Sequence, residues 1–310
     1  MSKATTTLRR SSNSHRINSG LGKDMSYEET IMELIYEPKG PAREYSAWAC
    51  NLYKGCGHKC EYCFGPHFAY QGEKEADKKR LFQQPTIRGP ANLSEQERVK
   101  ILLKKLDREA AMFAKTIAAN PGAWTTDRVL MSFTSDPYQP LEDQYNLTKQ
   151  ALEIFGKHGV PATVLTKSSR AMRDIDIFVK YNVAFATTII FMDESKRIAI
   201  EPNASPIKER LDTLAAMRAK GLPTWVSLEP IIDTNEAMAV IDALIGKTDK
   251  IKVGVIDCRW DMGDVHKKIE WAKFLADALV ALYNRQSYYI KDGLWQYADQ
   301  SIKDTWPREQ

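Results

Sequence analysis

The chain has 310 residues, of which 43% are hydrophobic and 27% are charged, and its formal net charge is +4. These proportions are typical of globular proteins and argue against a disordered, fibrous or membrane protein. No apolar run approaches the ~20 residues that span a bilayer, and the N-terminus lacks the apolar core of a secretory signal. We therefore expect a cytoplasmic protein without a membrane partner.

Residues 1–25 are predicted to form a disordered basic tail, because they are rich in Ser, Thr, Asn and Arg and show no apolar periodicity. All of the net positive charge is concentrated there, so the remainder of the chain is about neutral. Such a tail can contact nucleic acid, although a solvated tail is the commoner case. Residues 26–45 are predicted to be an extended segment that leads into the main domain, since EPKGPARE contains two prolines and a glycine.

Residues 46–286 alternate between short apolar runs and amphipathic segments. Strands are predicted at 45–53, 128–134, 161–167, 183–190, 223–231 and 250–256, and helices at 93–119, 143–159, 170–181, 207–221, 235–246 and 265–286. This alternation indicates an α/β fold with a parallel sheet covered on both faces. Polar residues gather where the strands end, and those ends meet on one rim of a βα barrel. The aromatic C-terminal extension, residues 287–310, is expected to pack on the barrel, with base stacking as the less favoured alternative.

Three of the five cysteines lie in the stretch KGCGHKCEYCF, as Cys56, Cys60 and Cys63. An odd number of crowded cysteines argues against a disulfide framework. A structural zinc ion takes four protein ligands, usually as two separated pairs. The candidates for a fourth ligand are His58, His67, Cys50 and Cys258, and none has a convincing zinc spacing. Three thiolates without a fourth suit a [4Fe–4S] cluster with one open iron.

At these residues the chain resembles the radical S-adenosylmethionine (SAM) superfamily, whose signature is CxxxCxxC after the first strand of a partial (β/α)6 TIM-like barrel. Tyr62 occupies the aromatic position before the third cysteine. Three further blocks, at 134–142, 165–168 and 201–232, resemble the branch related to spore photoproduct lyase, often called DNA repair photolyase-like. The resemblance covers roughly residues 37–257.

The resemblance implies that the three cysteines hold the cluster and that the amino and carboxylate groups of SAM bind its open iron. One electron would then cleave SAM to methionine and a 5′-deoxyadenosyl radical that abstracts hydrogen from a substrate. A reductant protein of the flavodoxin or ferredoxin type would supply the electron. The residues expected to contact SAM are Tyr62 and Glu229, together with Ser132, Thr134, Ser135 and Asp136 near the methionine amino group. Lys167 is expected near the carboxylate, and Thr187 or Thr188 near the ribose.

Several functions stay open at this stage. The first is repair of a DNA lesion, as in spore photoproduct lyase, with nucleic acid as the substrate. The second keeps the radical chemistry but acts on a peptide, an RNA or a small molecule. The third is a non-catalytic zinc or iron–sulfur module. Cys258 is expected to be a small buried hydrophobe, and the sharper alternative is a hydrogen-atom donor that quenches a product radical.

Overall fold

The structure is a computed structural model that describes residues 33–119, 128–255 and 264–310. Within these ranges, eight strands form one sheet in the order β1-β2-β5-β6-β7-β8-β9-β10. The strands are β1 (Ile35–Tyr36), β2 (Trp48–Cys50), β5 (Val129–Met131), β6 (Ala162–Thr166), β7 (Ala184–Thr188), β8 (Thr224–Ile231), β9 (Lys250–Val255) and β10 (Tyr288–Ile290). β1 is antiparallel to β2, and every other neighbouring pair is parallel. The predicted α/β class with a parallel sheet is therefore confirmed.

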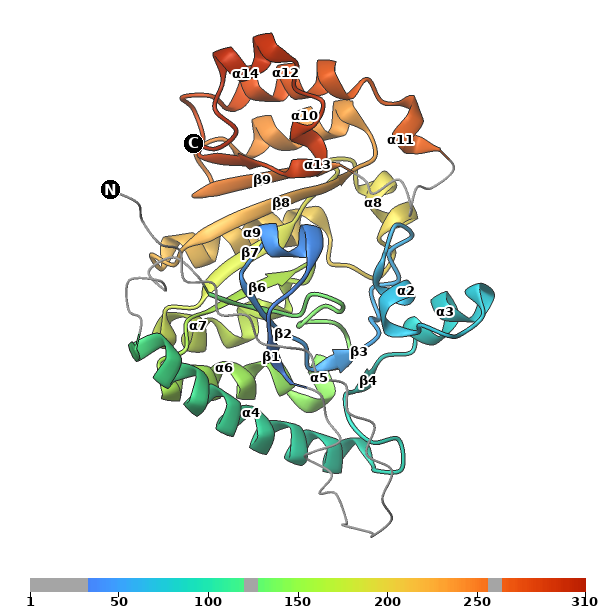
Figure 1. Ribbon diagram of the computed structural model, residues 1–310, viewed down its shortest axis with the longest axis vertical. Coiled ribbons are helices and arrows are strands. Elements are labelled where there is room, and N and C mark those ends of the chain that lie inside the picture. Colours follow the sequence, from blue (N-terminus) through green and yellow to red (C-terminus); the bar gives the residue numbers. More distant parts are fainter. Residues whose placement is uncertain (1–32, 120–127, 256–263) are drawn as a thin grey trace, which may run out of the picture.

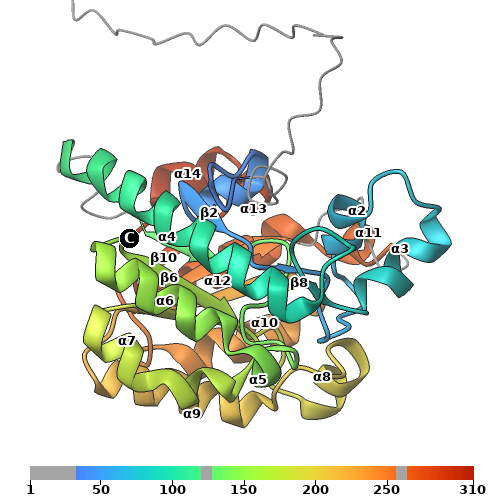
Figure 2. The same ribbon diagram turned by 90° about the horizontal axis from the view of Figure 1, so that it is seen from below.

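The main helices follow the strands and cover the sheet from outside. They are α4 (Glu95–Ala119), α6 (Leu147–His158), α7 (Ile175–Tyr181), α9 (Ile207–Ala219), α10 (Thr234–Leu244) and α12 (Trp271–Leu282). Shorter helices are η1 (Gly40–Glu44), α2 (Gly65–Ala69), α3 (Glu75–Phe82), α5 (Glu142–Tyr145), η3 (Ser169–Asp174), α8 (Glu194–Ile200), α11 (Val265–Lys268), α13 (Asp292–Trp295) and α14 (Gln300–Thr305). Helices α4, α6 and α7 lie side by side on the outer surface, whereas α2 and α3 project away from the body (Figures 1 and 2).

Local sequence signals explain how these helices begin and end. At the start of α4, the hydroxyl of Ser94 accepts a hydrogen bond from the backbone N–H of Glu97, and the Glu97 carboxylate accepts one from the backbone N–H of Ser94. This is the capping box expected from Ser-x-x-Glu. The predicted helix over 143–159 is divided because Asn146 adopts a left-handed φ of 48° between α5 and α6.

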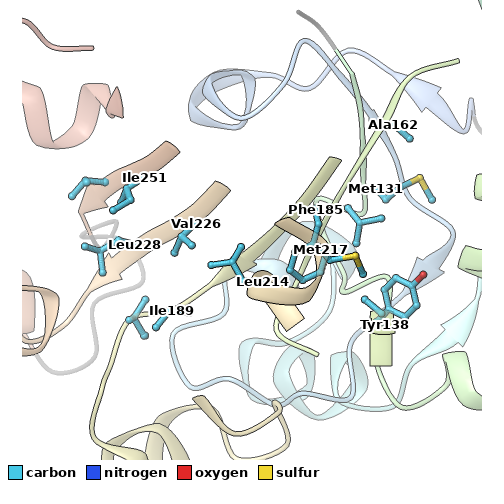
Figure 3. Packing of buried hydrophobic residues seen from close by; sticks show 14 of the residues in the cluster. Met131, Tyr138, Ala162, Phe185, Ile189, Leu214, Met217, Val226, Leu228 and Ile251 are labelled. Carbon is cyan, nitrogen blue, oxygen red and sulfur yellow. The ribbon is translucent and has the colours of Figure 1, made fainter. Parts of the chain in front are cut away.

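The strands pack against the helices through fully buried apolar side chains. Leu214 and Met217 of α9 lie beside Phe185 of β7, and Val226 and Ile251 continue the same core along β8 and β9 (Figure 3). Each of these side chains is at most 1% exposed. Because the helices supply this outer layer, the inner face of the sheet is free to carry polar groups near its carboxyl edge.

Further elements differ from the prediction. The strand expected at 45–53 is limited to β2, and the chain then forms a separate antiparallel pair of β3 (Tyr53–Lys54) with β4 (Thr86–Ile87). The helix expected at 265–286 is broken into α11 and α12 at Ile269, whose backbone is extended. In the aromatic C-terminal segment, β10 pairs in parallel with β9 and adds a seventh parallel strand.

The segment before β2 connects the two ends of the sheet. Glu44, the last residue of η1, accepts hydrogen bonds from the hydroxyl of Tyr289, the backbone N–H of Asp292 and the guanidinium of Arg308, at 3.0, 2.7 and 2.9 Å. All three partners belong to the C-terminal part of the chain. The extended segment predicted for residues 26–45 thus includes a short helical turn that is held against β10.

Candidate functional site

A cavity of about 900 Å³ lies at the carboxyl ends of the parallel strands. The cavity is lined by the cysteine loop, by η1 and by residues near the ends of the strands. These residues lie just after β5, β6 and β10, at the ends of β7 and β9, and within β8. This is the end of a βα barrel where active sites are built, because several strands there present side chains to one space. The volume is within the range of sites that bind small ligands.

The three predicted cysteines all line this cavity. Backbone N–H groups of the loop that carries them bond to residues outside the loop. The N–H of Cys56 donates to the Phe82 carbonyl at 2.8 Å, and the N–H of Gly57 donates to the side-chain oxygen of Gln139 at 2.9 Å. Gly55 has a φ of +84°, and a Cβ there would lie 2.5 Å from the Phe82 carbonyl oxygen. A glycine is therefore required at this point of the loop.

The thiols are in an environment that favours their neutral form. Burial raises the pKa of Cys60 to about 12, and burial is also the main reason that the pKa values of Cys56 and Cys63 lie above their ordinary value. Iron binding would replace those protons, since thiolates are the ligands of iron–sulfur clusters.

A single metal ion and an iron–sulfur cluster require different arrangements of their ligands. Among the described residues, no three Cys, His, Asp or Glu side chains converge tightly enough to hold one metal ion. A four-iron cluster does not need such convergence, because each cysteine binds a different iron. Three thiols on one cavity have the ligand chemistry of a [4Fe–4S] cluster, whose irons bind thiolates.

Asp136 is hydrogen-bonded to other protein groups, although it lines the cavity. Its carboxylate accepts hydrogen bonds from the Thr166 hydroxyl at 2.6 Å, the Tyr138 N–H at 2.9 Å and the Lys167 N–H at 2.9 Å, and His58 Nδ1 lies 3.3 Å away. Burial opposes its charge, but His58, the Thr166 hydroxyl and the Lys167 N–H hold its pKa below the ordinary value. Asp136 lines the cavity, yet its oxygens are already occupied by partners that fix the loop after β5.

The other polar residues of this loop divide into two kinds. Ser135 donates to the Gly55 carbonyl at 2.6 Å and so fixes the cysteine loop. Ser132 is buried with a φ of +62°, lines the cavity, and its hydroxyl has no hydrogen-bond partner among the described residues. A strained backbone with an unpaired hydroxyl is typical of a binding position. Thr134 also lines the cavity.

Lys167 and Tyr62 lie together on the cavity wall. The Lys167 ammonium lies 5.6 Å from the centre of the Tyr62 ring, and in the part of the chain that the structure describes it makes no ion pair or hydrogen bond. Burial opposes its charge, but Cys60, Glu201 and Asp136 nearby raise its pKa above the ordinary value of a lysine. The hydroxyl of Tyr62 donates to Glu201. Lys167 is thus a charged donor available to an anionic ligand group.

Of the two threonines at the end of β7, Thr188 lines the cavity and Thr187 does not. Glu229 lines it from β8, where its carboxylate accepts hydrogen bonds from Lys291 and Tyr45. Cys258 lies outside the described residues. The structure thus brings the three cysteines, Tyr62, Ser132, Thr134, Ser135, Asp136, Lys167, Thr188 and Glu229 to one cavity.

Sequence reasoning missed several residues of this site. Asn51 accepts hydrogen bonds from the N–H groups of Phe133 and Thr134 at 2.6 and 3.2 Å, and so positions the turn that contains Ser132. A polar residue directly after the apolar run of β2 is a signal that could have found it. Lys291 follows β10, which lies in the segment predicted as an aromatic extension rather than as a strand.

Comparison with known proteins gives relatives of this chain and of its fold. No family model matches the sequence. An uncharacterised protein, ORF301, of Acidianus two-tailed virus is 28% identical over 64% of this chain and 61% of its own length. A radical SAM Nalpha-GlyT isomerase of Pseudomonas phage M6 is 28% identical over 33% of this chain and 21% of its own length. The chain thus spans less than two thirds of either relative.

A solved structure of spore photoproduct lyase, with bound AdoMet and a dinucleoside spore photoproduct, matches with a TM-score of 0.55 and 14% identity, over 88% of this chain and 86% of that one. Its similarity concerns the fold, a mostly parallel sheet in a partial TIM-like barrel. No helix in the described ranges is long and apolar enough to span a membrane.

Proposed function

We propose that this chain, a member of the radical SAM superfamily by its fold and its cysteine motif, is an enzyme that cleaves SAM reductively to abstract hydrogen from a substrate. Proteins of this superfamily use a [4Fe–4S] cluster and SAM. The observation that carries the proposal is that three thiols line one cavity together with the Lys167 ammonium and the Ser132 hydroxyl, neither of which has a hydrogen-bond partner among the described residues.

Each of these residues has a role that its surroundings support. Cys56, Cys60 and Cys63 would hold the cluster. Lys167 would bind the SAM carboxylate, because it is a half-buried cation that lines the cavity without an ion-pair partner among the described residues. Ser132 would hydrogen-bond the methionine part and Thr188 the ribose. The cofactors supply the one-electron cleavage that yields a 5′-deoxyadenosyl radical.

The surrounding residues orient these groups and exclude water. Asp136, Ser135 and Gln139 fix the cysteine loop against the loop after β5 through their contacts with His58, Gly55 and Gly57 described above. Tyr62 closes the cavity beside Lys167 and is held by Glu201. A reactive radical requires such enclosure, because water and oxygen would otherwise intercept it.

For the substrate we propose a nucleic-acid base, and repair or modification of DNA as the reaction. Support comes from the sequence blocks that resemble the spore photoproduct lyase branch and from the fold similarity to a solved structure of that lyase, which holds a dinucleoside spore photoproduct. A target base would enter the cavity out of the helical stack. The electron would come from a flavodoxin or ferredoxin-type protein.

The experiment is anaerobic reconstitution with iron and sulfide, reduction in the presence of SAM, and detection of 5′-deoxyadenosine by mass spectrometry. We expect 5′-deoxyadenosine from the intact chain and none from Cys60→Ala. Isotope transfer from deuterated DNA, RNA and peptide pools then identifies the substrate class. An assembled cluster that never cleaves SAM with any of these pools would contradict the proposal, as would binding of zinc alone.

A further inference from the structure

One buried ring nitrogen of the cysteine loop has no role in the site described so far. The side chain of His58 is 1% exposed, and its Nε2 has no hydrogen-bond partner in the part of the chain that the structure describes. Buried polar atoms without a partner are rare in folded proteins, because such an atom has lost its hydration without compensation. His58 also lines the cavity, so a ligand bound there can supply the missing partner.

Both the backbone and the side chain of His58 are held in place. Its carbonyl accepts the N–H of Asn203 at 3.2 Å, and its own backbone N–H bonds to the Cys56 sulfur. At the side chain, Nδ1 lies 3.3 Å from Oδ2 of Asp136. The same oxygen accepts the backbone N–H of Lys167 at 2.9 Å. His58 is thus connected both to a proposed cluster ligand and to the lysine proposed to bind the SAM carboxylate.

Asp136 determines which nitrogen of the ring carries the hydrogen. Its carboxylate is ionised, since its pKa lies below the ordinary value, and an ionised carboxylate only accepts hydrogen bonds. The Nδ1 that faces this carboxylate is therefore the N–H of the neutral ring, and Nε2 carries the lone pair. The unpaired atom of His58 is thus an acceptor, and it requires a donor from the ligand.

The methionine part of SAM has one group that can donate to such an acceptor. Its carboxylate only accepts hydrogen bonds, and its sulfonium sulfur carries no hydrogen, whereas its amino group has N–H bonds. An amino group that binds the open iron through its lone pair keeps those hydrogens and can still donate them. Because His58 belongs to the loop that carries the three cysteines, it is well placed to meet a group bound to that iron.

We propose that Nε2 of His58 accepts a hydrogen bond from the amino group of SAM, with Asp136 as the positioning residue that fixes the ring. The inference rests on the proposed function, since SAM is a ligand of that enzyme. Asp136 itself was expected near this amino group. Its oxygens are occupied by donors of the protein, so it acts through His58 instead.

The test compares SAM with desamino-SAM, in which a hydrogen replaces the amino group of the methionine part. Equilibrium dialysis measures the affinity of each compound for the anaerobically reconstituted wild type and for His58→Asn. The Asn amide can take the place of Nδ1 beside Asp136, but it leaves no acceptor at the position of Nε2. We expect His58→Asn to bind SAM about tenfold more weakly than the wild type does. Its affinity for desamino-SAM should stay within about twofold of the wild type, because that compound lacks the donor.

His158→Asn is the matched control. His158 makes the same kind of contact, with its Nε2 2.9 Å from Asp107, but it lies on α6 and does not line the cavity. Both affinities should be unchanged in this variant. Iron and acid-labile sulfide per chain show whether each variant has assembled its cluster. If His58→Asn has not, His58→Gln takes its place, because its amide oxygen can reach the position of Nε2 and should preserve the wild-type ratio of the two affinities.

Either of two results would overturn the inference. An equal loss of affinity for SAM and for desamino-SAM would show that His58 supports the loop without bonding the amino group. Unchanged SAM affinity in His58→Asn would show that Nε2 has another partner, such as water. If His58→Gln is the variant measured, a ratio of affinities that differs from the wild type has the same meaning.

Failure of the proposed function has a different signature. If the wild type assembles no iron–sulfur cluster or never binds SAM, the radical chemistry is wrong, and this inference falls with it. If the wild type forms 5′-deoxyadenosine and His58→Asn binds SAM as tightly as the wild type, the radical chemistry stands and only the role of His58 is wrong.

Discussion

Glu201 joins the cysteine loop to helix α9 through its two carboxylate oxygens. One oxygen accepts the hydroxyl of Tyr62, and the other lies 2.7 Å from the Arg210 guanidinium, in an ion pair whose side chains are each 1% exposed. Arg210 also donates to the backbone carbonyls of Ser205 and Thr188, at 2.8 and 2.9 Å. One buried pair therefore connects the cysteine loop to the end of β7, where Thr188 lies.

Glu201→Ala should lower the free energy of unfolding by about 3 kcal/mol, because it leaves the buried charge of Arg210 without its partner. Urea denaturation of the metal-free protein measures this. Asp212→Ala is the control, since Asp212 pairs with Lys208 on the exposed surface of the same helix. A destabilisation no larger than that of Asp212→Ala would show that the buried pair does not hold the loop.

Replacement of any one of Cys56, Cys60 or Cys63 by Ala should abolish cluster assembly and 5′-deoxyadenosine formation, because each thiolate would bind a separate iron. Cys50→Ala should retain both, since Cys50 is fully buried at the end of β2 and does not line the cavity. Iron and acid-labile sulfide per chain are the measurements. Equal loss of iron in Cys50→Ala would mean that the ligand assignment is wrong.

Asn51→Ala should weaken SAM binding about tenfold, because the backbone N–H groups of Phe133 and Thr134 lose their acceptor and the turn at Ser132 loses its support. Equilibrium dialysis of SAM with the reconstituted protein measures the effect. The exposed Asn235, which follows β8, supplies the control Asn235→Ala. Unchanged SAM affinity in Asn51→Ala would show that the turn keeps its geometry without this side chain.

Lys252 should make stability depend on pH. Burial, together with Lys250 and Lys291, lowers its pKa to about 8, below the ordinary lysine value of 10.5. Between about pH 8 and pH 10.5 the unfolded chain therefore binds more protons at this site than the folded chain, so the contribution of Lys252 to stability rises with pH. The rise should be on the order of 1–2 kcal/mol.

The measurement is the difference in unfolding free energy between the wild type and Lys252→Met at pH 7.5 and at pH 10. Taking the difference removes the titration of the cysteines, which both proteins share. We expect the wild type to gain stability relative to Lys252→Met as the pH rises. A constant difference would show that Lys252 keeps an ordinary pKa despite its position against the Trp225 ring.

The sequence by itself determined the alternating strands and helices, the cap of α4 and the grouping of three cysteines. These features depend on residues close together in the chain, where apolar periodicity and loop spacing act directly. It also indicated that polar residues at strand ends would meet, because parallel strands share one carboxyl edge. For this reason the position of the cavity in the fold could be predicted from the sequence.

Only the tertiary structure decided which polar groups are available there and which are already paired. Asn51 supports Phe133 across 82 positions, and Lys291 reaches Glu229 across 62. No local pattern encodes such contacts, since they arise when the sheet curves and brings β8, η1 and the end of β10 to one cavity. Asp136 and Lys167 both follow strands and look equally available in the sequence, but folding surrounds the first with donors and leaves the second facing the cavity.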